Sequence, residues 1–180
     1  MITDREVGVV GLGLMGSSIV VSFLAAGHRV KAVAPIPDDL QQAPLRIRQH
    51  LAQCEKNNLL QDGIEGALAR LEISSDYGTL RDCELVMECV IELPAVKQAI
   101  YAEIEKNVSA ECVIASNTSA IPISELQLMV KRPQRFLGIH WAEPSYLTRF
   151  LEITCGSHTD PEVAEQIFSG RHVGARSLRC

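Results

Sequence analysis

Short apolar runs alternate along the chain with longer segments in which apolar residues recur every three or four positions. The first pattern predicts buried strands and the second predicts helices that bury one face. Because strands and helices alternate, we expect an α/β fold with a Rossmann-type, doubly wound and mostly parallel sheet. The expected strands are 7–10, 29–33, 71–74, 84–90, 112–116, 136–139 and 151–154.

Helices are expected between these strands. Gly27 is suited to end the first one, because glycine adopts a left-handed conformation without strain. Pro44 is expected to kink or delay the second helix, because proline lacks a backbone N–H. Asp160 and Pro161 are typical of the first positions of a helix. The expected helices follow residue 16, cover 38–63, 64–70, 94–107 and 123–129, and begin again at 161.

A glycine-rich turn, Gly11-Leu12-Gly13-Leu14-Met15-Gly16, joins the first strand to the first helix. Gly11 allows a sharp turn, Gly13 leaves the backbone bare for a pyrophosphate, and Gly16 lets the helix pack close to the strand. The phosphates would bind free N–H groups at the positive end of the helix. All six residues are therefore candidate cofactor-binding residues. The alternative is a packing turn without a ligand.

Composition limits the classes of protein and partner. Apolar residues make up 47% of the 180 residues, so one domain with a real core is expected over residues 1–170. The net charge of −5 argues against nucleic acid and anionic membranes as partners. Five glycines and a serine pair argue against a membrane span in the uncharged stretch 7–27. The N-terminus is not net basic, so we expect no secretory leader and predict a cytoplasmic location.

The cysteines and the last residues complete this picture. The six cysteines, at 54, 83, 89, 112, 155 and 180, show no CxxC spacing. We expect them to be small core residues, with no disulfide or metal site. Residues 171–180, RHVGARSLRC, have three arginines, no acid and no period. This tail is expected to be irregular, either as a frayed end or because truncation or a change of reading frame removed the natural continuation.

The end of the second strand departs from the dinucleotide-binding pattern. An acidic residue is expected there to hold the adenosine ribose hydroxyls, but the position is Ala34. Asp38 and Asp39 follow closely and are possible substitutes. No arginine stands at this point of the sequence to bind a 2′-phosphate, which favours NAD over NADP.

Polar residues follow three strands that should end at the same edge of the sheet, where ligands bind in this architecture. They are Glu92 after 84–90, Ser116, Asn117 and Ser119 after 112–116, and His140 after 136–139. An imidazole suits removal of a proton from an alcohol while hydride leaves the same carbon. Glu152, on the next strand, can orient such a base. The alternatives are a structural histidine and an ordinary strand-edge charge.

With these motifs the chain resembles the nucleotide-binding domain of the L-3-hydroxyacyl-CoA dehydrogenases, which use NAD to oxidise the 3-hydroxyl of fatty acyl-CoA to a 3-keto group. The resemblance covers Val7 to Phe168. It rests on VGVVGLGLMG, AGHRV, ECVIELPAVKQ, SNTSAIPIS, RFLGIHWAEP and FLEIT. The turn GLGLMG also resembles the 3-hydroxyisobutyrate-type dehydrogenases, but these lack the His–x11–Glu arrangement and use a lysine base.

The resemblance implies roles for individual residues. His140 would be the general base on the substrate 3-hydroxyl, and Glu152 would orient it and stabilise its charge. Ser119 would bind the substrate oxygen and align the nicotinamide. The turn from Gly11 to Gly16 would hold the pyrophosphate. Glu92 and Lys97 would contact the cofactor on its ribose and nicotinamide side, and Asn117 and Glu143 would also bind the cofactor.

The chain also departs from this family. Glu143 replaces an asparagine near the nicotinamide, where a carboxylate would either favour the oxidised ring or weaken the site. The resemblance also implies a C-terminal helical domain that supplies much of the acyl pocket, the dimer interface and a further catalytic asparagine in a GFxxNR-like segment, and we expect this domain to be missing here. The expected function is NAD-dependent oxidation of a 3-hydroxyacyl-CoA, weak or lost in this chain alone. The alternatives are a non-catalytic NAD-binding fragment and a related dehydrogenase acting on a sugar acid or small hydroxy acid.

Overall fold

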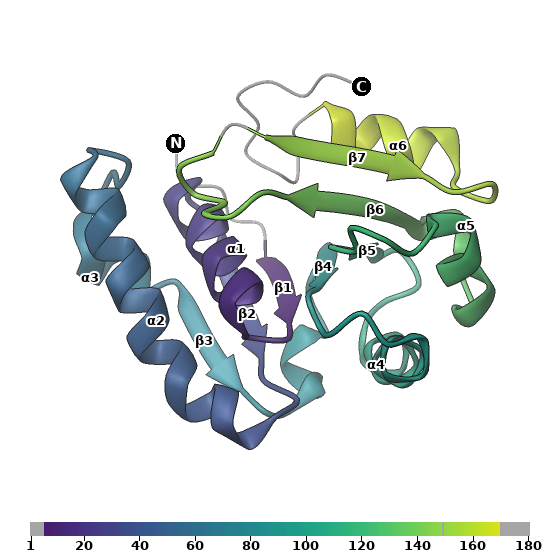
Figure 1. The fold of residues 1–180 in the computed structure, drawn as a ribbon, viewed down its shortest axis with the longest axis horizontal. Helices are drawn as coiled ribbons and strands as arrows, with labels where there is room; N and C mark the ends of the chain where they lie inside the picture. The colour runs from purple at the N-terminus through teal and green to yellow at the C-terminus, as the bar shows by residue number, and fades with distance from the viewer. Residues whose placement is uncertain (1–5, 149, 170–180) are drawn as a thin grey trace.

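A computed structural model describes residues 6–148 and 150–169 of the chain (Figure 1). Its centre is a seven-stranded sheet in the order β3-β2-β1-β4-β5-β6-β7. The first six strands are parallel, and only β7 runs antiparallel, beside β6. This confirms the predicted Rossmann-type, doubly wound sheet. The strands are β1 (Glu6–Val10), β2 (Arg29–Val33), β3 (Leu71–Ser74), β4 (Leu85–Glu88), β5 (Val113–Ser116), β6 (Phe136–Trp141) and β7 (Leu151–Cys155).

Helices cover both faces of the sheet, because the central strands send alternate apolar side chains to opposite sides. The helices are α1 (Leu14–Ala25), α2 (Pro37–Lys56), α3 (Gly63–Leu68), α4 (Pro94–Asn107), α5 (Ile123–Leu126) and α6 (Pro161–Phe168). Val9 and Met87 belong to the core beneath α1, α2 and α6, whereas Val86 and Ile114 belong to the core beneath α4 and α5. The chain also forms three short 3-10 helices within the described residues, η1 (Tyr77–Leu80), η2 (Gln127–Met129) and η3 (Pro133–Arg135).

The limits of several predicted elements differ from the structure, as for the strand predicted over 84–90, which is β4, and two differences have a clear physical cause. The second helix runs through Pro44 and ends at Lys56, not at residue 63. Asn58, two residues after this end, adopts a left-handed φ of 55°. Tertiary packing of α2 on the core outweighs the hydrogen bond that Pro44 cannot donate. The strand 136–139 continues through His140 to Trp141, because β7 pairs with these residues as well.

The cysteine prediction is partly wrong. Cys54, Cys83 and Cys112 are buried, as expected of small core residues, but Cys155 is exposed on the edge strand β7. No helix among residues 6–148 and 150–169 is long and apolar enough to cross a membrane. The predicted irregular tail, residues 171–180, lies outside the described residues.

Candidate active site

The three glycines of the first turn occupy three different environments. Gly11 has a φ of +93°, and a Cβ there would lie 2.9 Å from the backbone of Cys89. A Cβ on Gly16 would lie 1.8 Å from the carbonyl oxygen of Gly11. A Cβ on Gly13 would meet nothing within 4 Å. Gly11 and Gly16 are therefore required by packing, while Gly13 faces open space.

The open space above Gly13 lies at the start of α1. Gly13 is the N-cap residue of this helix, and no side chain caps it. The first N–H groups of a helix have no partner within the helix, so they are available to an anion here. A bare backbone beside free N–H groups fits the pyrophosphate of a dinucleotide.

The other residues of the turn are placed unequally. Leu12 is fully buried, so only its backbone can face a ligand, and its carbonyl oxygen already accepts a hydrogen bond from the Ser17 hydroxyl at 2.9 Å. Leu14 is 60% exposed and Met15 is partly buried. Either side chain is free to contact a ligand seated over the turn.

His140 and Glu152 lie opposite each other on the antiparallel pair β6 and β7. Nδ1 of His140 is 3.5 Å from a carboxylate oxygen of Glu152, and the rings of His140 and Phe150 are nearly perpendicular, in a T-shaped contact. Such contacts are often longer without substrate and shorten when it binds. Because Nδ1 is turned toward Glu152, Nε2 is the nitrogen left for a substrate. The predicted proximity of these two residues is confirmed.

Ser119 joins this pair. A hollow of about 240 Å³ is lined by Ser119, His140 and Glu152, together with Gly138, Thr154 and residues 120–123. The hollow lies at the carboxyl end of β5, which is the ligand-binding edge in this architecture. The structure therefore brings the three predicted catalytic residues together around one cavity, while their roles stay predictions.

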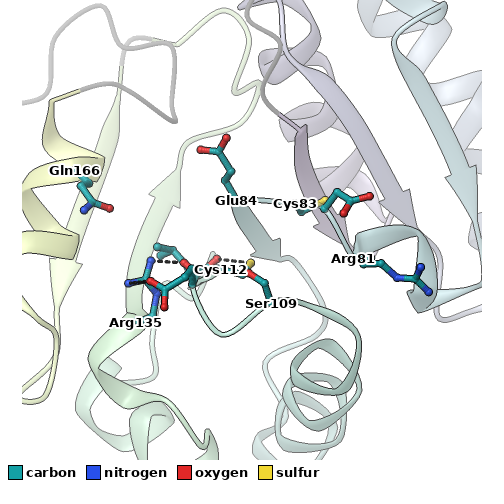
Figure 2. Close-up of a pocket in the computed structure, with 10 residues that line it drawn as sticks. Arg81, Cys83, Glu84, Ser109, Cys112, Arg135 and Gln166 are labelled. Atoms are coloured by element: carbon teal, nitrogen blue, oxygen red, sulfur yellow. Dashed lines mark hydrogen bonds and ion pairs between the residues drawn. The ribbon is translucent and has the colours of Figure 1, made fainter.

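A larger cavity, of about 510 Å³, lies at the opposite end of the sheet (Figure 2). Figure 2 shows Cys83 and Glu84 just ahead of β4, Ser109 and Cys112 just ahead of β5, and Gln166 on α6. Burial raises the pKa of the Cys112 thiol to about 12, so it is not a reactive thiolate at neutral pH. Ligand sites in parallel sheets lie beyond the carboxyl ends of the strands, so this cavity is not the candidate site.

Glu92 is hydrogen-bonded to Ser119 and to its neighbour Thr118. Its carboxylate accepts hydrogen bonds from the Ser119 N–H at 3.0 Å and from the Thr118 hydroxyl at 3.1 Å. Lys97 lies 3.3 Å from the same carboxylate but is only 1% exposed. The structure therefore leaves Lys97 no surface for the predicted direct contact with a cofactor, because the helix α4 that carries it turns it into the core.

The partner that holds Lys97 inside is Glu88, which the sequence analysis missed. Glu88 is fully buried at the end of β4 and accepts hydrogen bonds from Lys97 at 2.8 Å and from the hydroxyls of Tyr101 and Ser116 at 2.7 Å each. Burial, together with the negative charge of Glu88, raises the pKa of Tyr101, which stays a neutral donor. A carboxylate ending an apolar strand, in LVME, was the available signal.

Asn117 and Glu143 differ in their surroundings. Oδ1 of Asn117 accepts a hydrogen bond from the backbone N–H of Trp141 at 3.0 Å, which ties the end of β5 to β6. Glu143 is exposed, and its charge acts on His50 of α2. Burial lowers the pKa of His50, and Glu143 opposes that effect. Contact of Asn117 or Glu143 with the nicotinamide stays a prediction.

The family model described as 3-hydroxyacyl-CoA dehydrogenase, NAD binding domain, matches residues 6–174. The chain belongs to this family. The fold, the NAD-binding class and the predicted resemblance are thereby confirmed. The roles of the individual site residues stay predictions.

Curated relatives are multifunctional proteins of fatty acid oxidation. The peroxisomal fatty acid beta-oxidation multifunctional protein MFP2 of Arabidopsis thaliana is 31% identical over 160 residues, which are 88% of this chain and 22% of that protein. The fatty acid oxidation complex subunit alpha of Pseudomonas savastanoi pv. phaseolicola is 32% identical over 181 residues, or 97% of this chain and 24% of that protein. The chain thus spans less than a quarter of the length of these relatives. Because one relative is peroxisomal, a cytoplasmic location stays a prediction.

Solved structures show the same likeness. FadB2 of M. tuberculosis has a TM-score of 0.88 and 33% identity, with all of this chain and 64% of that chain covered. The (S)-3-hydroxybutyryl-CoA dehydrogenase PaaH1 of Ralstonia eutropha has a TM-score of 0.84 and 29% identity, with 95% of this chain and 62% of that chain covered. The similarity extends over the whole described sheet and beyond the glycine turn.

Proposed function

We propose that this chain provides the nicotinamide-binding and proton-transfer site for oxidation of a 3-hydroxyacyl-CoA to a 3-ketoacyl-CoA. The observation that carries the proposal is the pairing of His140 with Glu152 at 3.5 Å, with Ser119 lining the same hollow. A base, an orienting acid and a hydroxyl donor around one cavity are what removal of a proton from an alcohol requires.

The reaction divides between the side chains and the cofactor. Nε2 of His140 accepts the proton of the 3-hydroxyl as the carbonyl bond forms, and Glu152 stabilises the resulting imidazolium. The Ser119 hydroxyl donates a hydrogen bond to the same substrate oxygen. When bound, NAD accepts the hydride that leaves carbon 3.

Glu92 supports this arrangement from the side of the glycine turn. It accepts the N–H of Ser119 and lies beside Lys97, which is itself anchored on buried Glu88. We infer that Lys97 and Glu88 fix Glu92 and so set the position of the Ser119 hydroxyl. They act as positioning residues, because neither has a surface that reaches the hollow.

We propose that residues outside this sequence, in a longer protein, complete the acyl-CoA site and the dimer interface. Within the described residues, 31% of the His140 side chain and 57% of the Glu152 side chain remain exposed. Water screens charges at such exposure, so the pair is weaker than a buried one. We therefore expect slow turnover from this chain alone.

The experiment is an assay of acetoacetyl-CoA-dependent NADH oxidation by the chain and by two histidine variants. His140→Gln removes the base and should lower the rate by about 100-fold or more. His158→Gln changes an exposed histidine outside the hollow and should leave the rate unchanged. Equal, measurable rates for the two variants would show that His140 is not the base.

A second candidate is a non-catalytic NAD-binding module, favoured by the same exposure of His140 and Glu152. Under it, the chain binds NADH but oxidises none when acetoacetyl-CoA is added. A third candidate is a dehydrogenase of small hydroxy acids or sugar acids, which the departures at Ala34 and Glu143 leave open. A panel of such acids, tested beside CoA esters, separates it from the main proposal.

A further inference from the structure

The end of β2 lacks the acceptor that a dinucleotide needs. In this architecture a carboxylate there receives hydrogen bonds from the adenosine ribose hydroxyls. Ala34 occupies the position and is only 2% exposed, packed into the core. A buried methyl group can accept nothing, so the ribose must be met by another residue.

Helix α2 brings a charged pair to the same place. Nη2 of Arg46 donates to the carbonyl oxygen of Leu12 at 2.6 Å and to Oδ1 of Asp39 at 2.7 Å. Its Nε also approaches the Ser17 hydroxyl, at 3.5 Å. One guanidinium therefore ties the carboxylate of Asp39 to the glycine turn itself.

The helix explains how residues distant in sequence meet the turn. Asp39 is in the first turn of α2, and Arg46 lies two turns further on, on the same side. Ala43 and Ile47 are buried beside them and hold this side of α2 against the core. No arginine is close to the end of the second strand in the sequence, but in the structure α2 brings Arg46 back to Leu12.

Both members of the pair remain within reach of a ligand. The side chain of Asp39 is 21% exposed and that of Arg46 is 29% exposed. Oδ1 of Asp39 is engaged by Arg46, whereas a carboxylate has about four acceptor positions on its two oxygens. The remaining positions can accept hydrogen bonds from a diol.

We propose that Asp39, held by Arg46, replaces the missing acid at position 34, binds the adenosine ribose hydroxyls and selects NAD over NADP. The carboxylate accepts from the 2′- and 3′-hydroxyls and repels a 2′-phosphate. It also occupies the guanidinium, which would otherwise bind that phosphate in a bidentate manner. This proposal rests on the NAD-binding class of the domain and is independent of the proton-transfer step assigned to His140.

The test is a binding titration with NADH and with NADPH, followed by the fluorescence of the reduced nicotinamide. The unmodified chain should bind NADH at least about tenfold more tightly than NADPH, the ratio expected of one charge-assisted hydrogen bond. Asp39→Asn should weaken NADH by about tenfold and strengthen NADPH, so that the preference is lost or reversed. Asp38→Asn, at the exposed neighbouring carboxylate, should change neither affinity by more than about twofold.

A double variant identifies the group that takes the 2′-phosphate. Adding Arg46→Met to Asp39→Asn should remove the NADPH affinity that the single variant gained. Thermal melting of each variant shows whether it folds, and Asp39→Asn should melt normally, because asparagine still accepts from Arg46. An unchanged ratio of NADH to NADPH affinity in Asp39→Asn, or a change in Asp38→Asn instead, would overturn the proposal. Failure of the unmodified chain to bind either nucleotide would contradict the cofactor site as a whole, whereas binding without turnover would contradict only the proposed reaction.

Discussion

The two halves of the ligand edge are built in different ways. Around β1 and α1, the glycine turn is enclosed by fully buried neighbours, and two of its three glycines have no room for a methyl group. Around β6 and β7, the proposed acid–base pair stands on the last two strands of the described sheet, with the Glu152 side chain more than half exposed. Figure 1 shows these regions separated along the sheet by β4 and β5.

This difference separates binding from catalysis. The glycine turn proposed to hold the cofactor is shaped within the described residues, by packing among β1, α1 and the segment after β4 and by the hydrogen bond from Arg46 of α2 to Leu12. The acid–base pair is aligned by strand pairing but not shielded from water. We therefore expect this chain to bind NAD well and to transfer protons poorly.

The largest expected effect contrasts two glycines of the turn. Gly13→Val fills the open space and should weaken NADH binding by about 100-fold or more. The melting temperature should change little, because no atom outside the adjoining residues lies within 4 Å of a Cβ at this position. Gly16→Ala places a methyl group 1.8 Å from a carbonyl oxygen and should prevent stable folding. Calorimetric titration and thermal melting check both results. A Gly16→Ala protein that melts like the unmodified chain would show that the turn is not rigid.

The next test concerns the buried ion pair of Lys97 and Glu88, at the end of β4 between the two halves. Lys97→Met leaves the Glu88 carboxylate buried without its cation and should lower the free energy of unfolding by about 3–5 kcal/mol. Urea unfolding measures the loss. Lys106→Met, which removes an exposed cation on the same helix, should cost less than about 1 kcal/mol. Similar losses in the two variants would contradict the role of Glu88 as a buried anchor.

Removal of the orienting acid, Glu152, should lower the turnover rate without changing the affinity for NADH. Glu152→Gln should lower the rate of acetoacetyl-CoA reduction by about 10- to 100-fold, a smaller loss than for a fully buried partner, because Glu152 is exposed. The affinity for NADH should stay the same, as should both quantities in the control Glu165→Gln on α6. Parallel loss of NADH affinity in Glu152→Gln would show that the two halves are not separable.

The smallest expected effect concerns the link from α2 to the loop after β6. Nδ1 of His50 lies 2.8 Å from the hydroxyl of Tyr146, and burial lowers the pKa of His50 below 6.5. The unfolded chain then binds a proton more readily than the folded chain, so this stability is present above pH of about 6.5 and is lost as the pH falls through the lowered pKa. Melting temperatures measured across this range should fall more steeply toward acid in the unmodified chain than in His50→Gln. Identical pH profiles would exclude this contribution.

Much of the fold was predictable because local patterns and tertiary packing agree. The limits of β2, β3 and α4 match the predicted 29–33, 71–74 and 94–107. Pro44 shows where they disagree, since packing carries α2 through a residue that favours a break. Local signals were reliable where the apolar pattern had one interpretation.

The site was predictable only as far as strand ends reveal it. His140 and Ser119 could be brought together because the parallel strands before them end at one edge, and Glu152 because the next strand returns beside His140. Glu88 and Arg46 were missed, because each acts through a partner that the chain reaches by a helix, and no spacing rule shows that contact.

The most direct test of the account is a crystal structure of this chain with NAD bound. The account predicts that the pyrophosphate lies over Gly13 and that the nicotinamide enters the hollow lined by Ser119 and His140. The distance from C4 of the ring to Nε2 of His140 should be about 5–6 Å, which leaves room for one carbon and its oxygen between them. A nicotinamide on the other side of β4, or one turned away from His140, would contradict the central claim.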